Sequence, residues 1–158
     1  MPAFRLRVVV GPEDIDDLGH TNNVSYLRWV QQVAESHWSR LSRRVPASER
    51  DRLMWVVRRH EIEYLAQSYP GESLELITWV PSSGPATCDR ATLVRRSGDG
   101  ATLVEALSTY CILDAATGRP RRVTDSMRAL FGNPPVVARP RREPFPPLPA
   151  EIEEAGAA

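Results

Sequence analysis

The sequence predicts an α+β domain in which an antiparallel sheet packs against one long helix. Two observations support this class. A helical pattern of apolar residues follows residue 21, and four strand-like runs separated by short turns follow residue 54. With 158 residues, the chain is long enough for one domain with a substantial core.

The first strand and the helix are expected in the N-terminal third. Residues 4–10 are rich in β-branched residues and end at Gly11-Pro12, which predicts a strand. After a polar turn, Asn22 or Asn23 can cap a helix. Apolar residues then recur at helical spacing, at Leu27, Val30, Ala34, Trp38 and Leu41. This stripe predicts a long buried helix that ends near Ser42.

Four further strands are predicted at residues 55–65, 73–80, 87–96 and 101–113. Their hairpin-length turns make them antiparallel, and with the first strand they complete a five-stranded sheet. Thr124 and Asp125 can cap a short helix. Apolar residues on both faces of the strands, Trp79 and Ile112 among them, suggest a second buried face and therefore an oligomer.

The composition changes after residue 133. Half of the 14 prolines lie between Pro134 and Pro149, and the last eight residues are acidic and small. We therefore divide the chain into a folded domain at 1–133 and a Pro-rich tail at 134–158 that is extended or disordered. Docking of this tail across a partner subunit is the alternative.

Composition and charge exclude several classes of function. Lys+Arg and Asp+Glu are both 20, so the balanced charge predicts neither a nucleic-acid partner nor binding to an anionic membrane. No run is long enough to span a bilayer, and the N-terminus has no signal-peptide pattern. Cys88 and Cys111 have neither metal-ligand nor redox spacing. We expect a cytoplasmic protein without a metal site.

The segment 14–29 carries the densest set of chemically active residues. It places three aspartates, a histidine, two asparagines and a tyrosine on a Gly-containing turn that leads directly into the helix. Amides at a helix N-terminus stabilise developing negative charge, and carboxylate and imidazole groups can transfer protons. Such an arrangement can hydrolyse an acyl compound.

The pattern Asp14-x-Asp16-x-x-Gly19-His20-x-Asn22-Asn23-x-x-Tyr26-Leu27-x-Trp29 resembles the signature of hot-dog-fold acyl thioesterases. The most similar branch is the 4-hydroxybenzoyl-CoA thioesterase-like acyl-CoA thioesterases, with plant acyl-ACP (acyl-carrier-protein) thioesterases as more distant relatives. Residues 60–65 and 70–76 resemble the family's second strand and the turn after it. The resemblance, over residues 4–131, implies a hot-dog fold with the sheet wrapped around one central helix. It also implies a homodimer or homotetramer with active sites at the subunit interface.

The resemblance implies a catalytic role for Asp16, as nucleophile or as general base for water. An Asx-turn or helix-cap aspartate is the alternative. His20 matches a catalytic histidine of the plant enzymes and could orient Asp16, bind the carbonyl or protonate the thiolate. Its alternative is a loop histidine bonded to the backbone. We interpret Asp14 and Asp17 as solvated or turn-forming.

The expected substrate-binding residues are Asn22, Asn23, Val24, Tyr26, Arg59 and His60. The amides of Asn23 and Val24, with Asn22 just before them, are expected to form an oxyanion hole, whereas the asparagine side chains could only cap the helix. Tyr26 either lines an acyl pocket or fills the core. The phosphates of a CoA substrate need basic groups, for which the sequence offers Arg58, Arg59, Arg90, Arg95 and Arg96.

The sequence departs from the plant enzymes at two places. Leu18 stands where they carry an asparagine, and Gln67-Ser68 where they carry an acidic residue and a cysteine. An aspartate-centred mechanism like that of the bacterial CoA enzymes is therefore favoured. Glu61 and Glu63 are candidates for a second carboxylate, and strand alternation puts both on one face.

The sequence thus predicts hydrolysis of an acyl-CoA thioester to free acid and CoA, with no cofactor beyond the CoA of the substrate. Release of acyl chains from a carrier protein is the second enzymatic hypothesis. A non-catalytic acyl-CoA-binding module is the third.

Overall fold

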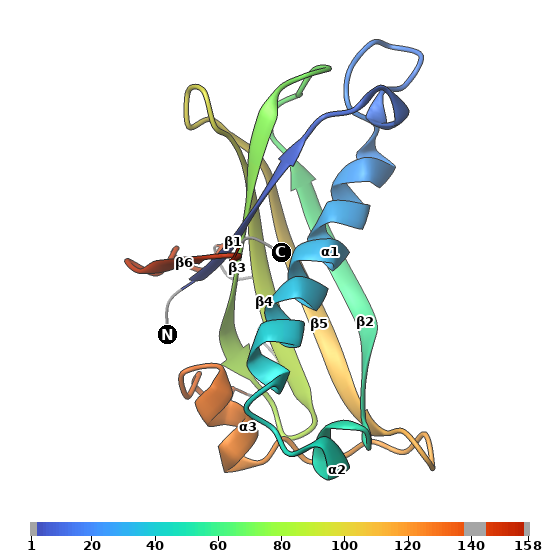
Figure 1. Ribbon diagram of the computed structural model, residues 1–158, viewed down its shortest axis with the longest axis vertical. Coiled ribbons are helices and arrows are strands. Elements are labelled where there is room, and N and C mark those ends of the chain that lie inside the picture. Colours follow the sequence, from blue (N-terminus) through green and yellow to red (C-terminus); the bar gives the residue numbers. More distant parts are fainter. Residues whose placement is uncertain (1–2, 138–144, 157–158) are drawn as a thin grey trace.

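The structure is a computed structural model that describes residues 3–137 and 145–156. A curved six-stranded sheet packs one face against helix α1 (Asn23–Ser42), as Figure 1 shows. The strands are β1 (Ala3–Val9), β2 (Leu53–Tyr64), β3 (Ser73–Ser83), β4 (Thr87–Arg96), β5 (Thr102–Asp114) and β6 (Ile152–Glu154). Their order is β2-β5-β4-β3-β1-β6, and all pairs are antiparallel except β1 with β6. The predicted α+β hot-dog fold is confirmed, with one strand more than predicted.

Helix α1 forms where its apolar stripe and cap residue predict it. The side chain of Asn22 caps the helix, and the buried residues Tyr26, Trp29, Val30 and Val33 face the sheet. They pack against β-strand side chains of the central core, which include Phe4, Leu74, Leu76, Val94 and Val104. Two short helices, α2 (Ala47–Arg50) and α3 (Asp125–Leu130), lie near the far end of α1 (Figure 1). No helix in the described residues is long and apolar enough to cross a membrane.

Strand β2 forms one edge of the sheet and changes register halfway. Its pairing with β5 shifts between Val57 and Arg59. Trp55, before this bulge, faces inward and packs on Trp38 of α1. The bulge reverses the alternation of the strand, so that His60 also faces inward, with its Nδ1 2.7 Å from Ser108 Oγ. Arg59 and both glutamates that follow lie instead on the outer face, where they line a surface hollow.

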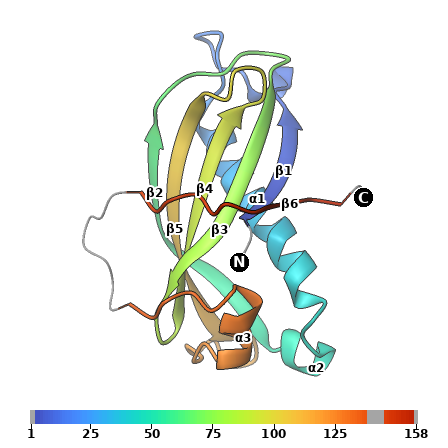
Figure 2. The same cartoon turned by 90° about the vertical axis from the view of Figure 1, so that its left-hand side faces the viewer.

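The C-terminal segment packs back onto the sheet of the same chain. Figure 2 shows it crossing the face turned away from α1, where β6 pairs in parallel with β1. Phe145 packs edge-on against Trp79 with ring centroids 5.8 Å apart, and Arg5 pairs with Glu154. Trp79 is therefore covered by the chain itself and gives no support for an oligomer. Residues 138–144 of the predicted tail lie outside the described residues.

Candidate active site

A tight hairpin places Asp16 beside His20 immediately before α1. Its stem is the bridge between Ile15 and Thr21, and the Asp16 N–H donates to the His20 carbonyl over 3.0 Å. Gly19 closes the turn at φ +80°, a left-handed conformation that disfavours side chains. His20 Nδ1 lies 3.7 Å from Asp16 Oδ2, and the two side chains are 20% and 26% exposed. The hairpin therefore forms a partly desolvated acid–imidazole pair.

The two carboxylate oxygens of Asp16 have different tasks. Oδ1 accepts a hydrogen bond of 2.9 Å from the Leu18 N–H, which is an Asx turn. Oδ2 faces His20 and has no hydrogen-bond donor among the described residues. One oxygen holds the turn, and the other is available for chemistry.

The amides at the start of α1 are not equally available. The Val24 N–H donates to Asn22 Oδ1 over 2.8 Å, and the Ser25 N–H donates to the Asn22 carbonyl over 3.0 Å. Asn22 is thus the helix cap. The Asn23 N–H has no acceptor among the described residues. Of the two predicted oxyanion donors, only Asn23 is left free, at the positive end of a 20-residue helix.

Ser68 connects the hairpin to the helix. Its Oγ lies 2.6 Å from Thr21 Oγ1 and 2.7 Å from the Tyr26 hydroxyl, and its carbonyl accepts the Thr21 N–H over 2.9 Å. All three residues are at most 3% exposed. Tyr26 is therefore a core residue, as one of its two interpretations predicted. Sequence reasoning missed the role of Ser68, because only the fold brings it to Thr21.

Asp14 is not solvated. It is 2% exposed, pairs with Arg28, and accepts the Gly11 N–H over 3.0 Å. The turn-forming interpretation is the correct one, since Asp14 organises the short 3₁₀ turn Pro12–Asp14. Asp17 is exposed, as expected.

A pocket of about 230 Å³ lies on the inner face, between the second half of α1 and strands β2, β4 and β5. Its wall comprises Gln31, Ala34, Glu35, Trp38, Trp55, Val57, Cys88, Arg90, Tyr110 and Phe131. The wall is largely aromatic and aliphatic, which suits an acyl group. Within one chain its nearest helical residue, Gln31, lies about 12 Å along α1 from Asn23 at 1.5 Å per residue.

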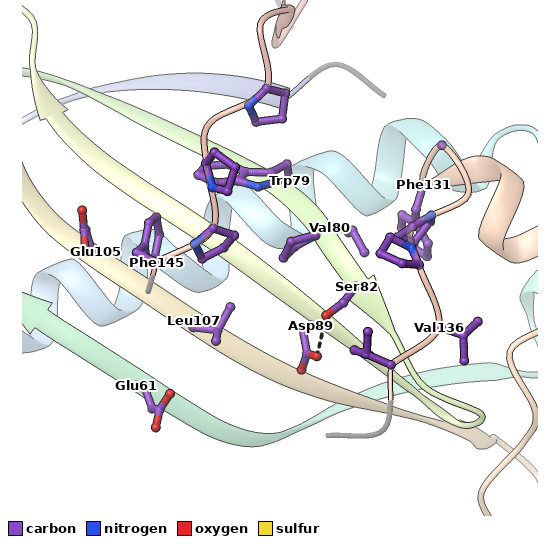
Figure 3. A pocket seen from close by; sticks show the side chains of 18 of the residues that line it. Glu61, Trp79, Val80, Ser82, Asp89, Glu105, Leu107, Phe131, Val136 and Phe145 are labelled. Carbon is purple, nitrogen blue, oxygen red and sulfur yellow. Dashed lines mark hydrogen bonds between the residues drawn. The ribbon is translucent and has the colours of Figure 1, made fainter. Parts of the chain in front are cut away.

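A larger hollow of about 1500 Å³ lies on the opposite face of the sheet, beneath the C-terminal segment (Figure 3). Glu61 borders it, and Ser82 Oγ donates to Asp89 Oδ2 over 2.8 Å within it. Neither Asp16 nor the start of α1 lines this hollow. In one chain, Arg59 thus lies on the face away from Asp16. His60 lies on the inner face, where burial lowers its pKa.

His37 and Arg90 form a buried polar contact beneath α1. His37 stacks on Phe4, and its Nδ1 lies 3.0 Å from Arg90 Nη1. Burial, together with the positive charges of Arg90 and Arg40, lowers the pKa of His37 to about 3, so the ring is neutral and accepts this hydrogen bond. Arg90 is only 5% exposed and cannot meet CoA phosphates at the surface. Among the described residues, no three His, Cys, Asp or Glu side chains gather as metal ligands.

A mostly antiparallel sheet wrapped around one long central helix defines this protein as a hot-dog fold. The sequence model of the acyl-ACP thioesterase N-terminal domain matches residues 3–131, and the chain belongs to this family. The resemblance identified from the sequence is confirmed.

Known relatives support the family and the fold. An acyl-[acyl-carrier-protein] hydrolase of Cuphea viscosissima is 31% identical over 87 residues, which cover 54% of this chain and 21% of that protein. The chain spans 21% to 25% of the curated relatives it matches. The solved 1,4-dihydroxy-2-naphthoyl-CoA thioesterase from Synechocystis superposes with a TM-score of 0.71 at 11% identity, covering 83% of this chain and 96% of that one. The 12:0-ACP thioesterase from Umbellularia californica superposes with a TM-score of 0.70 at 23% identity, covering 82% of this chain and 52% of that one.

Replacing Ser68 with alanine should destabilise the protein by about 1–3 kcal/mol, because Thr21 and Tyr26 lose a buried hydrogen-bond partner. Chemical denaturation measures this loss. Ser48→Ala, at an exposed position in α2, is the matched control and should change stability little. Equal losses in the two variants would contradict the role of Ser68.

The buried His37 should make stability depend on pH. Its pKa is about 3 when folded and 6.5 ordinarily, so the unfolded chain binds more protons between these values. The contribution of neutral His37 is therefore complete above pH 6.5 and is lost as pH falls toward 3. Between pH 6.5 and 4.5, the wild type should lose about 2 kcal/mol more unfolding free energy than His37→Gln. If the unfolding free energies of the wild type and of His37→Gln change with pH in parallel, His37 is not buried and neutral.

Proposed function

We propose that this protein hydrolyses acyl thioesters at the N-terminus of α1. The observation that carries the proposal is the pairing of Asp16 Oδ2 with His20 beside the free Asn23 N–H. A thioester carbonyl that accepts the Asn23 N–H would have its developing oxyanion stabilised by the positive end of α1. Asp16 would then act on the carbonyl carbon from the adjoining hairpin.

In the general-base form, Asp16 Oδ2 takes a proton from water while the water oxygen bonds to the carbonyl carbon. The tetrahedral intermediate then expels the thiolate, which takes up the proton held by Asp16, either directly or through His20. In the nucleophilic form, Oδ2 itself bonds to the carbonyl carbon and the C–S bond breaks to release the thiolate. Water then cleaves the resulting anhydride to the free acid and the Asp16 carboxylate, and its proton goes to the thiolate. Single turnover in ¹⁸O-water distinguishes the two, because only the nucleophilic form can leave label in Asp16.

We propose acyl-CoA as the first candidate substrate. Leu18 and Ser68 replace residues that the plant carrier-protein enzymes carry, which argues against their mechanism. The family match and the Cuphea relative instead support a carrier-protein substrate as the second candidate. Both substrates present a thioester on the same phosphopantetheine arm, so one site chemistry serves both.

We further propose a homodimer formed along the β2 edge. One side of this 12-residue strand has no neighbouring strand among the described residues. The strand exposes Met54, Val57 and Tyr64 at 37–42%. An exposed apolar edge strand is a surface that pairs with another strand. A two-fold axis near the bulge would pair β2 antiparallel with its copy.

This pairing would complete the site. Helix α1 starts beside Tyr64, whose hydroxyl donates to the Asn23 carbonyl over 3.2 Å, and its second half lies beside Trp55. Antiparallel β2 strands bring the Tyr64 end of one copy to the Trp55 end of the other. The hairpin of one protomer would therefore approach the inner pocket of its partner.

Asp16→Asn should lower kcat/KM for acyl-CoA hydrolysis by at least about 100-fold, the usual contribution of a general base or nucleophile. The amide retains the acceptor for the Leu18 N–H, so the turn is preserved. Release of free thiol from a panel of acyl-CoAs and the matching acyl-carrier proteins measures the activity. The control is Asp17→Asn at the neighbouring exposed position, which should retain nearly full activity.

Full activity in Asp16→Asn would contradict the mechanism. Higher activity on carrier-protein thioesters would select the second candidate. Tight acyl-CoA binding without turnover in the wild type would support a binding module and refute hydrolysis.

A further inference from the structure

Arg90 is a buried cation without an anionic partner. It is 5% exposed, and no carboxylate among the described residues lies within 4.0 Å of its guanidinium. The ionisable side chains that act on it most strongly are Cys88 and Tyr110, and burial raises the pKa of both, that of Cys88 to about 12. Both are neutral at pH 7. A buried charge left without a counter-ion is costly, so its presence needs an explanation.

The protein uses only part of the hydrogen-bonding capacity of Arg90. Nη1 contacts His37 Nδ1 at 3.0 Å and Thr78 Oγ1 at 3.3 Å, both of them neutral groups. Nε and Nη2 have no acceptor among the described residues. A guanidinium offers five N–H groups in a planar fork that matches a carboxylate. Its remaining donors suit an anion that enters from outside.

Arg90 lies in the wall of the inner pocket. The same wall holds Tyr110, whose hydroxyl has no hydrogen-bond partner among the described residues, and Trp55, whose Nε1 is buried without one. Glu35 is the carboxylate of this wall, but it is exposed on α1 and makes no ion pair among the described residues. Aromatic surfaces from Trp38 and Phe131 enclose the remaining space. The wall is thus mostly apolar, with the cationic Arg90 buried in it and the anionic Glu35 on its exposed side.

We propose that this pocket binds an acyl group whose distal end carries a carboxylate, so that the preferred substrate is the monothioester of a short dicarboxylic acid. The carboxylate pairs with Nε and Nη2 of Arg90, and Tyr110 adds a donor. The pocket volume of about 230 Å³ limits the length of the acyl group. A cavity of about 150 Å³ holds the six carbons of benzene, so this pocket accommodates a chain only slightly larger. The thioester end extends to the Asp16 hairpin, so the assignment of the substrate rests on the proposed hydrolase function.

Matched substrates test the specificity directly. Adipoyl-CoA and hexanoyl-CoA have acyl chains of equal length and differ in the terminal carboxylate. The wild type should show a kcat/KM about 10- to 100-fold higher for adipoyl-CoA, the range expected for hydrogen bonds to a charged group. Arg90→Met should abolish or invert this preference. Arg119→Met, at an exposed position after β5, should retain it. A wild-type preference for hexanoyl-CoA, or equal rates, would overturn the proposal.

A binding measurement separates this proposal from the hydrolase function. Calorimetry with Asp16→Asn should give tighter binding of adipoyl-CoA than of hexanoyl-CoA, whether or not the wild type turns either over. Tight binding without wild-type hydrolysis refutes the proposed function and leaves the pocket assignment intact. Hydrolysis of both substrates without preference supports the proposed function and refutes the pocket assignment. If Arg90→Met does not fold, Tyr110→Phe should still lower the adipoyl preference, and an unchanged preference would count against the pocket.

Discussion

The hydrogen bonds of Ser68 fix the start of α1, and the candidate site depends on them. Ser68 joins the hairpin at Thr21 to the helix at Tyr26, with all three residues buried. The hairpin can then present Asp16 and His20 at a fixed position relative to the free Asn23 N–H. A catalytic group must be held in its working geometry by its neighbours, and this cluster supplies that support.

The regular elements of the fold can be predicted from the sequence because their signals are local. The apolar stripe and the Asn22 cap predict α1, and the glycines and prolines of the turns delimit the strands. Strand β6 cannot be predicted in this way. It comprises three residues and exists through parallel pairing with β1 at the other end of the chain. Its formation therefore depends on tertiary contacts rather than on local preference.

The sequence motif selects the residues of the candidate site, but it does not show which of their groups are already hydrogen-bonded. The motif indicates Asp16 and His20, whereas the cap hydrogen bond that occupies Val24 and leaves Asn23 free is visible only in three dimensions. The bulge in β2 decides that Arg59 faces outward and His60 inward, a choice that strand alternation alone cannot make. Arg90, one of five arginines considered for phosphate binding, is buried by its place on β4 beneath α1.

We propose that the Asp16 hairpin of one copy acts on an acyl group held in the pocket of another. Subunit complementation tests it most directly, by mixing Asp16→Asn with Ala34→Phe, whose ring fills the inner pocket. Neither variant should be active alone. After subunit exchange, a heterodimer carries one intact site, so an equal mixture should recover about a quarter of wild-type activity. Subunit exchange is demonstrated separately. If exchange occurs and activity does not recover, both parts of the site lie within one chain and the proposal is wrong.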